Sequence, residues 1–190
     1  MVTAARTVPA APSGTGRAWA VAAAVPDPEL PMLTLADLGV LAEVEEDGAA
    51  GSATAWLTPT YSGCPAVAEM AADVDRRLRA AGYRDVRVRL RLDPPWSTDM
   101  ITAEGRRKLA EAGIAPPRPG AAAGAAGVSA RGPVPLTLGP VRTSTGAPPV
   151  PCPLCGAEDT EELSRFGSTA CKALWRCRSC REPFERVKEI

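Results

Sequence analysis

Apolar and polar residues follow two different periods along the first half of the chain. Between residues 65 and 81 the apolar side chains recur every three or four positions, which predicts an amphipathic helix that stops at Gly82. Residues 86–92 alternate strictly between apolar residues and arginine, which predicts a strand with one buried face. The other face of this strand carries Arg87, Arg89 and Arg91. We interpret that face as solvated, with contact to an acidic partner as the alternative.

Weaker patterns complete a small domain over residues 17–115. Further helices are predicted at residues 17–25, 35–38 and 102–112, and further strands at residues 40–45 and 53–57. The order of the main elements is then β-β-α-β-α. This order predicts an α+β fold, in which helices cover one face of a small mixed sheet.

The segments around this domain differ in composition. Residues 1–16 are rich in alanine, proline, threonine and glycine and are predicted to be disordered. Residues 116–149 are dominated by proline, glycine and alanine, which is typical of a linker, with one candidate edge strand at residues 134–138. Residues 150–190 are expected to form a separate small β module.

Four cysteines in that last segment form two Cys-x-x-Cys pairs, Cys152 with Cys155 and Cys177 with Cys180. Their spacing matches a zinc ribbon, in which four thiolates close a tetrahedral metal site. Disulfides or a redox-active dithiol are the alternatives. A ribbon of this size has too little core to fold unaided, so we expect metal binding to supply on the order of 10 kcal/mol of its folding free energy.

Charge and composition exclude several classes of function. Lysine plus arginine and aspartate plus glutamate both number 22, and a net charge of zero argues against a general nucleic-acid binder. Histidine is absent, which excludes Ser-His-Asp and Cys-His nucleophiles as well as His-ligated zinc hydrolases and di-iron sites. No apolar run approaches the ~20 residues of a membrane span. We therefore expect a cytoplasmic protein with neither nucleic acid nor membrane as partner, which would handle metal through sulfur or carboxylate.

Cys64 is the first candidate for chemistry outside the ribbon. It directly precedes the predicted 65–81 helix, and Pro65 suits the first helical position. Cys64 is then expected at the N-cap, where free amides and the helix dipole lower a thiol pKa and favour a nucleophile or metal ligand. Thr60 would line the same pocket. The alternative is a small buried apolar residue.

Three carboxylates and a further cysteine complete the candidates. Asp27, Glu29 and Asp37 are positioned in the sequence to face Cys64 and help to hold a metal ion, with capping of turns and helices as the alternative. Cys171 lies outside the two Cys-x-x-Cys pairs. It is interpreted as an additional ligand, a reactive thiol or a buried residue.

Several of these segments together resemble the metal–sulfur cluster biosynthesis family, which includes the SUF-system T protein. The resemblance covers residues 18–115 and rests on Asp-Pro-Glu-Leu-Pro at 27–31, Asp-Leu-Gly at 37–39, the loop 58–65 with its Gly-Cys-Pro, and Asp-Pro-Pro-Trp at 93–96. It implies that Cys64, Asp27, Glu29, Asp37 and Thr60 take part in transfer of a metal or cluster.

The ribbon segment 166–184 resembles that of the D (or J) subunits of the bacterial phenylacetyl-CoA epoxidase system. This resemblance implies an accessory subunit in aerobic phenylacetate degradation that is not catalytic alone and that assists iron or iron–sulfur assembly. The implied cofactors are a structural zinc and a transient iron or iron–sulfur cluster, and the implied partners are the oxygenase or reductase subunits. A permanent structural subunit and a rubredoxin-like electron carrier are the alternatives, and a homodimer is a candidate assembly.

Overall fold

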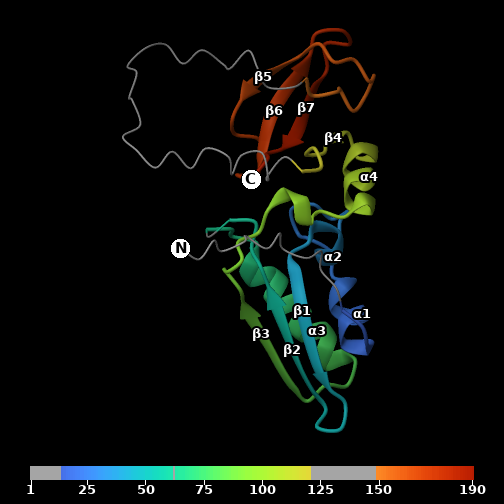
Figure 1. Ribbon diagram of the computed structural model, residues 1–190, viewed down its shortest axis with the longest axis vertical. Coiled ribbons are helices and arrows are strands. Elements are labelled where there is room, and N and C mark those ends of the chain that lie inside the picture. Colours follow the sequence, from blue (N-terminus) through green and yellow to red (C-terminus); the bar gives the residue numbers. More distant parts are fainter. Residues whose placement is uncertain (1–13, 62, 121–148) are drawn as a thin grey trace, which may run out of the picture.

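The computed structural model describes residues 14–61, 63–120 and 149–190 (Figure 1). Two β-sheets lie at opposite ends of its long axis, with short helices between them. The candidate strand at residues 134–138 lies outside the described residues, as do most of the predicted linker and of the predicted disordered start.

The first sheet is mixed, as predicted, and has the strand order β1-β2-β3. Strand β1 (Leu41–Asp47) pairs antiparallel with β2 (Ser52–Leu57), and β2 pairs parallel with β3 (Asp85–Leu90). Side chains on β2 alternate between the two faces because successive residues of a strand point to opposite sides. Ala53, Ala55 and Leu57 are buried on one face.

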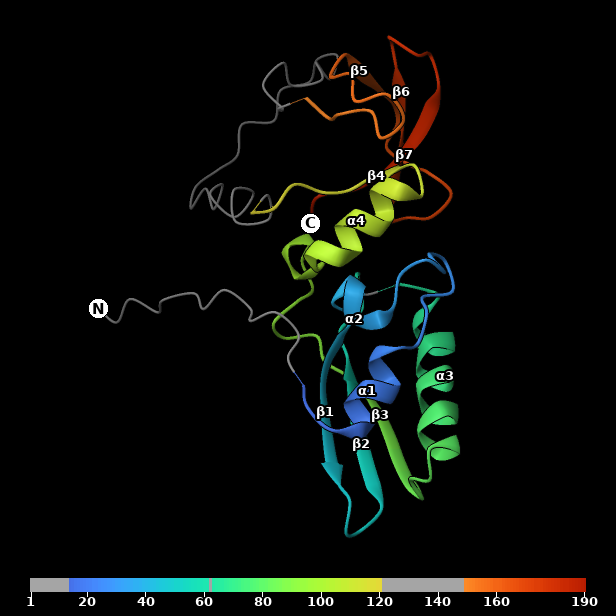
Figure 2. The same ribbon diagram turned by 90° about the vertical axis from the view of Figure 1, so that its right-hand side faces the viewer.

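Two helices, α1 (Arg17–Ala23) and α3 (Val67–Ala80), cover that buried face (Figure 2). Helix α3 contributes Met70, Val74 and Leu78, whose spacing of four residues places them on one side of the helix. Their burial against the sheet forms the main hydrophobic core. The predicted α+β class is therefore confirmed.

The opposite face of the sheet carries Arg87 and Arg89 of β3, together with Arg91, which directly follows that strand. The guanidinium groups of Arg89 and Arg91 lie over the Trp56 ring, 5.4 and 5.1 Å from its centroid. Arg91 also pairs with Glu43 of β1, with an N–O distance of 2.6 Å. Arg87 pairs with Asp85 of the same strand at 3.1 Å, so all three arginines are engaged by neighbours in the sheet itself.

Three short elements lie at the end of this sheet that faces the second sheet: α2 (Leu35–Leu38), the 3-10 turn η1 (Thr98–Met100) and α4 (Ala103–Glu111). Helix α4 packs against α2 and does not cover the sheet face. The Trp96 indole donates a 3.0 Å hydrogen bond to the Leu38 carbonyl, which fixes the loop before η1 to this end of the domain.

The second sheet has the order β4-β7-β6-β5 and is built from β4 (Ile114–Ala115), β5 (Thr160–Ser164), β6 (Lys172–Cys177) and β7 (Pro183–Val187). Strands β5, β6 and β7 form an antiparallel ribbon, while β4 pairs parallel with β7. Ile114 of β4 and Val187 of β7 are buried in the main core. The ribbon is therefore joined to the first domain by both a strand pairing and shared core residues.

Candidate functional site

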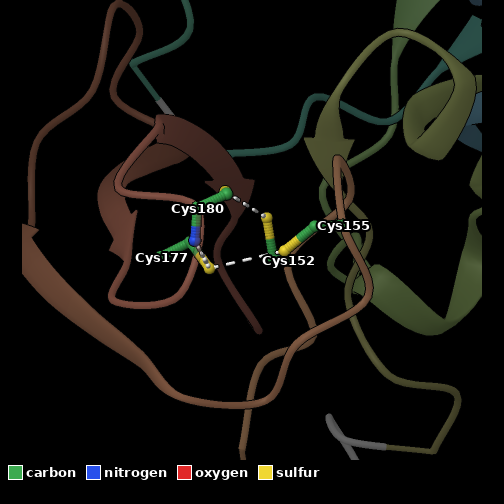
Figure 3. A group of neighbouring side chains, drawn as sticks. All are labelled: Cys152, Cys155, Cys177 and Cys180. Carbon is green, nitrogen blue, oxygen red and sulfur yellow. Dashed lines mark hydrogen bonds between the residues drawn. The ribbon is translucent and has the colours of Figure 1, made fainter.

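The four ribbon cysteines converge on one point (Figure 3). Cys152 and Cys155 lie in the turn before β5, Cys177 ends β6, and Cys180 lies in the turn before β7. Their sulfur atoms all lie within 4.8 Å of one another. The Cys152–Cys180 and Cys155–Cys177 sulfur distances are 3.8 and 3.6 Å. A tetrahedron with metal–sulfur bonds of about 2.3 Å has edges of about 3.8 Å, so the spacing fits a bound metal ion.

Backbone amides near the cysteines donate hydrogen bonds to the sulfur atoms and change the pKa values of two of the thiols. The amides of Cys180 and Ser179 donate hydrogen bonds that outweigh burial and lower the pKa of Cys177 to about 6. The Glu182 amide lowers the pKa of Cys180, but burial and the neighbouring thiols outweigh it and raise that pKa to about 12. Four thiols this close therefore cannot all ionise by themselves. A divalent cation removes this conflict, because thiolates are the ligand form.

The structure places Cys64 differently from the sequence-based expectation. Helix α3 begins at Val67 and its N-cap is Ala66, so Cys64 lies two residues before the cap and the N-cap prediction was wrong. The reason is a turn before the helix, in which the Cys64 amide donates to the Tyr61 carbonyl at 3.2 Å. This turn continues through Pro65 and delays the helix.

The expected lowering of the Cys64 pKa was wrong as well. The side chain is half-buried, and burial raises its thiol pKa. The Ala66 amide and the Thr60 hydroxyl bond to the sulfur and lower the pKa, but the charge of Glu29 raises it further. Burial determines the direction of the pKa shift because the helix dipole acts mainly within the first turn of the helix, and Cys64 precedes that turn. The thiol is neutral at pH 7.

Asp27 and Glu29 lie within electrostatic range of Cys64, as the sequence suggested. Asp27 is 4% exposed, and its Oδ1 accepts hydrogen bonds from the amides of Glu29 and Leu30 at 2.9 and 2.8 Å. This is a capping role, which was the alternative considered for it. Glu29 is half-buried, and among the described residues its carboxylate accepts no such bond from the backbone.

Asp37 serves a different purpose from the one proposed for a metal ligand. Its carboxylate accepts from the Thr34 amide at 3.0 Å and pairs with Lys108 of α4 at 2.7 Å. The Thr34 hydroxyl in turn accepts from the Asp37 amide, which completes a capping box at the start of α2. Asp37 therefore links α2 to α4.

The ribbon brings Cys171 toward the Cys64 side of the first domain. Cys171 directly precedes β6, and its sulfur lies 3.1 Å from the Thr169 hydroxyl. Burial raises the pKa of this thiol, and Glu29 of the first domain raises it further. Burial likewise raises the pKa of Tyr61, and the charges of Cys64, Glu29 and Cys171 add to it. Glu29 thus lies within electrostatic range of both thiols and of Tyr61.

Sequence reasoning missed two residues that take part in these interactions. Tyr61 had no signal beyond its place in the loop before Cys64. Lys172 is 4% exposed and pairs with Glu185 at 2.7 Å. Its positive charge also acts on Asp27 of the first domain, where it tends to lower the carboxyl pKa. A lysine that begins a strand carries no sequence signal of burial, since lysine is rarely buried unless paired.

No helix in the described part of the chain is both long and apolar enough to cross a membrane. This finding agrees with the composition of those residues.

Comparison with known proteins matches the two halves separately. Residues 19–90 match the family model of iron-sulfur cluster assembly proteins, and residues 138–188 match the PaaD zinc beta ribbon domain. A protein of Escherichia coli (strain K12), described as the putative D subunit of 1,2-phenylacetyl-CoA epoxidase, is 40% identical over 95% of this chain and 96% of its own length.

Two further relatives each match less than half of this chain. The Fe-S protein maturation auxiliary factor of Porphyromonas gingivalis (strain ATCC BAA-308 / W83) is 34% identical over 44% of this chain and 78% of its own length. The crystal structure of a domain of unknown function, DUF59, from Bacillus anthracis is 28% identical with a TM-score of 0.44, and it covers 48% of this chain and 87% of its own.

Proposed function

Because this chain belongs to the family of putative 1,2-phenylacetyl-CoA epoxidase D subunits, we propose that it is an accessory subunit that assists iron or iron–sulfur assembly in that system. The oxygenase or reductase subunits are its partners. Two matches support the proposal: residues 19–90 match iron-sulfur cluster assembly proteins, and a relative that matches 44% of this chain is described as an Fe-S protein maturation auxiliary factor.

One structural observation carries the assignment of roles. The ribbon cysteines surround a single point and are suited to hold a structural zinc ion, whereas Cys64 is a free thiol outside that group. Cys171 is also a free thiol outside that group, but Cys64 lies in the part of the chain that matches iron-sulfur cluster assembly proteins, so we assign to Cys64 the binding of a metal or cluster that is cargo. The ribbon holds the shape of the second sheet.

The chemistry of Cys64 suits a temporary hold on cargo. A thiol must lose its proton to bind a metal, and the raised pKa of Cys64 makes this loss unfavourable at neutral pH. The same cost favours reprotonation when the metal leaves. A single thiol of this kind binds a metal more weakly than four converging thiols such as those of the ribbon, which is the order required if the ribbon keeps its metal while cargo moves on.

Replacing Cys64 tests this function in cells. We expect Cys64→Ser to abolish maturation, so that the oxygenase purified from those cells has little iron and little activity. The variant itself should keep its zinc content and circular dichroism, since Ser differs from Cys by one atom. Wild-type iron content and activity in cells that carry Cys64→Ser would reject the proposal.

An electron-carrier function for the ribbon is tested by the same preparation. Cys155 and Cys180 are exposed, so a redox metal at this site would be reachable by a partner. An iron-loaded four-thiolate site absorbs visible light, whereas a zinc-loaded site is colourless and cannot transfer electrons. We expect a colourless protein with zinc in metal analysis.

A further inference from the structure

Strand β3 forms one edge of the first sheet (Figure 1). The strand order is β1-β2-β3, so no strand of the described residues pairs with the outer side of β3. At the start of this edge, the Arg79 guanidinium of α3 donates to the carbonyls of Arg84 and Val86 at 3.1 and 3.4 Å. From residue 88 onward, nothing in the described part of the chain covers the edge in this way.

The backbone of this free part directs hydrogen-bonding groups outward. The amides of Asp85 and Arg91 both donate to carbonyl groups on the β2 side. Successive residues of a strand direct their peptide groups alternately to its two sides, so the odd-numbered residues between these two also bond to β2. Val88 and Leu90 therefore direct their N–H and C=O groups away from the sheet. Such a row of unpaired groups on an edge strand is a template for one more strand.

The two faces beside this edge differ in chemistry. On the open face, Arg87 has an exposed ion pair within β3, which is weak in water, and Arg89 has no carboxylate partner among the described residues. On the other face, Leu90 is 52% exposed, and Leu92 just beyond the strand is 61% exposed. The edge thus presents positive charge on one face and uncovered apolar surface on the other.

We propose that the free edge of β3 is a docking site for an extended acidic segment of a partner protein, which joins the first sheet as a fourth strand. Hydrogen bonds from its main chain to Val88 and Leu90 provide the affinity. Its carboxylates lie beside Arg87 and Arg89, and the apolar side chains that alternate with them cover Leu90, which provides the specificity. The site uses none of the six cysteines, so it does not rest on the function proposed above.

Charge favours this occupant over a segment of this chain. Residues 1–13 and 121–148, which lie outside the described residues, contain no aspartate or glutamate. The other edge of the sheet, β1, has the sequence Leu-Ala-Glu-Val-Glu-Glu-Asp and would repel an acidic segment, so such a segment is directed to β3.

Charge and symmetry also disfavour a second copy. Antiparallel pairing of β3 with β3 of another copy would bring two rows of arginines together, which is destabilising. Pairing of β3 with the acidic β1 of another copy would satisfy the charges. That contact is head-to-tail, however, and would continue from copy to copy into a filament.

A synthetic peptide tests the site on the full, metal-loaded chain. The sequence Glu-Thr-Glu-Val-Glu-Thr-Glu, with blocked ends and a fluorescent label, is the same in both directions, so the test does not depend on strand direction. We expect saturable binding by fluorescence anisotropy, weakened by added salt, and none of the analogue in which lysine replaces every glutamate. No saturation at about 1 mM acidic peptide would overturn the proposal.

Variants of the protein separate the main-chain contribution from the charge. Leu90→Pro removes an outward N–H without removing a bond to β2, and it should weaken binding by about tenfold or more, whereas Leu90→Ala keeps this N–H and should lose less. Arg89→Glu should weaken binding by about tenfold, because an attractive cross-strand pair becomes repulsive. Arg76→Glu makes the same change of net charge at an exposed position on α3 and should bind like the wild type. Circular dichroism checks that each variant is folded.

Amide exchange in the wild type gives a readout that needs no variant. In nuclear magnetic resonance spectra, the amides of Val88 and Leu90 should exchange with solvent more slowly once the peptide is bound, while those of β1 should not change. Binding without slower exchange at Val88 and Leu90, or wild-type affinity in both Leu90→Pro and Arg89→Glu, would overturn the proposal. Self-association of the chain alone that Arg89→Glu removes would do so as well, because a second copy would then occupy the edge.

Discussion

The Cys64 thiol stays neutral because burial destabilises its thiolate form more than hydrogen bonds stabilise it. A thiolate at this place would be partly removed from water and would face the negative charge of Glu29. The Ala66 amide and the Thr60 hydroxyl stabilise the thiolate, but they offset only part of the effect of burial and of Glu29 on the pKa. At the scale of single residues, Cys64 is thus a protonated thiol at neutral pH and not a free nucleophile.

Alkylation of Cys64 should show this directly. The rate of its reaction with iodoacetamide in the zinc-loaded protein should rise with pH and reach half its maximum above the pH at which an unstructured cysteine does so. Glu29→Gln should shift this midpoint to lower pH, because one negative charge near the thiolate is lost.

Mass spectrometry of the Cys64 peptide measures the rate, and Glu45→Gln is the matched control on an exposed strand. A midpoint at or below that of the unstructured cysteine contradicts the prediction.

The Asp37–Lys108 pair allows a stability prediction at the same scale. Burial alone would raise the pKa of Asp37, but hydrogen bonds from Lys108 and Thr34 outweigh it and hold that pKa below its ordinary 3.8. The pair therefore stabilises the fold above pH 3.8, and this contribution disappears as the pH falls through the lower folded-state pKa. We expect Lys108→Met to lower the free energy of unfolding at pH 7 by about 1–3 kcal/mol.

Urea denaturation at pH 7 and pH 3 measures the effect, with the difference shrinking at pH 3. Arg107→Met is the control on the same helix, because Arg107 is exposed and its ion-pair partners among the described residues are Glu104 and Glu111 of that helix. It should cost less than about 1 kcal/mol. An equal cost at both pH values for Lys108→Met would show that the pair does not act through the ionised carboxylate.

The role of a residue could be predicted from the sequence when its partners lie a few positions away in the chain, and not when they are distant. The Asx-type cap at Asp27 and the capping box at Asp37 use neighbours within three positions, so capping was a sound alternative from sequence alone. Cys171 is more than 100 positions from Glu29, and no local rule predicts that the charge of Glu29 acts on its thiol. The pKa of Cys64 was mispredicted because a two-residue delay in the helix start removed the expected dipole effect.

At the scale of elements, periodic patterns were reliable and short elements were not. Helix α3 and strand β3 were predicted to within a few residues because each has a repeating apolar pattern, of period near 3.6 and of 2. Strand β4 has two residues and no pattern of its own. Its pairing with β7 depends on the ribbon and could not be read from residues 114 and 115.

Removal of the metal should affect the second sheet selectively. The ribbon core consists of a few buried residues around the cysteines, so metal binding is expected to supply on the order of 10 kcal/mol of its folding free energy. A strong chelator should expose the amides of β5, β6 and β7, and those of β4 with them. The first sheet should stay folded, since its core is formed mostly by its own helices and strands.

Hydrogen exchange measured by mass spectrometry on the intact chain, with and without chelator, tests this. Peptides from β1, β2 and α3 are the internal control. Loss of protection throughout the chain, or in none of it, would contradict the separation.

At the scale of the whole molecule, the two halves are coupled through a small set of residues. Val187 belongs to the ribbon by strand pairing and to the first domain by packing. Arg118 and Glu189 form a further ion pair at 2.9 Å, and the Thr98 amide donates to the Ile190 carbonyl at 3.1 Å. The presence of two units followed from composition and cysteine spacing, but this joint did not, because its residues are ordinary on their own.

The coupling predicts that the cost of Val187→Ala depends on metal. In the zinc-loaded protein the substitution leaves a cavity in the shared core and should cost about 2 kcal/mol. In the chelated protein the ribbon is already unfolded and the cost should be near zero.

Thermal unfolding with and without chelator gives both values, and Val88→Ala on β3 is the control whose cost should not change. An equal cost of Val187→Ala in the two states would mean that the halves are independent.

The parallel pairing of β4 with β7 also sets an order of events during synthesis. Residues 114 and 115 leave the ribosome long before residues 183–187, and they stay unpaired until the tail has been made and metallated. Ile114 and Ala115 are 8% and 2% exposed in the folded protein. In cells starved of the ribbon metal, these apolar residues would therefore remain exposed to solvent. Newly made chains would then be exposed to chaperones or proteases, and the supply of the ribbon metal would govern how many of them survive.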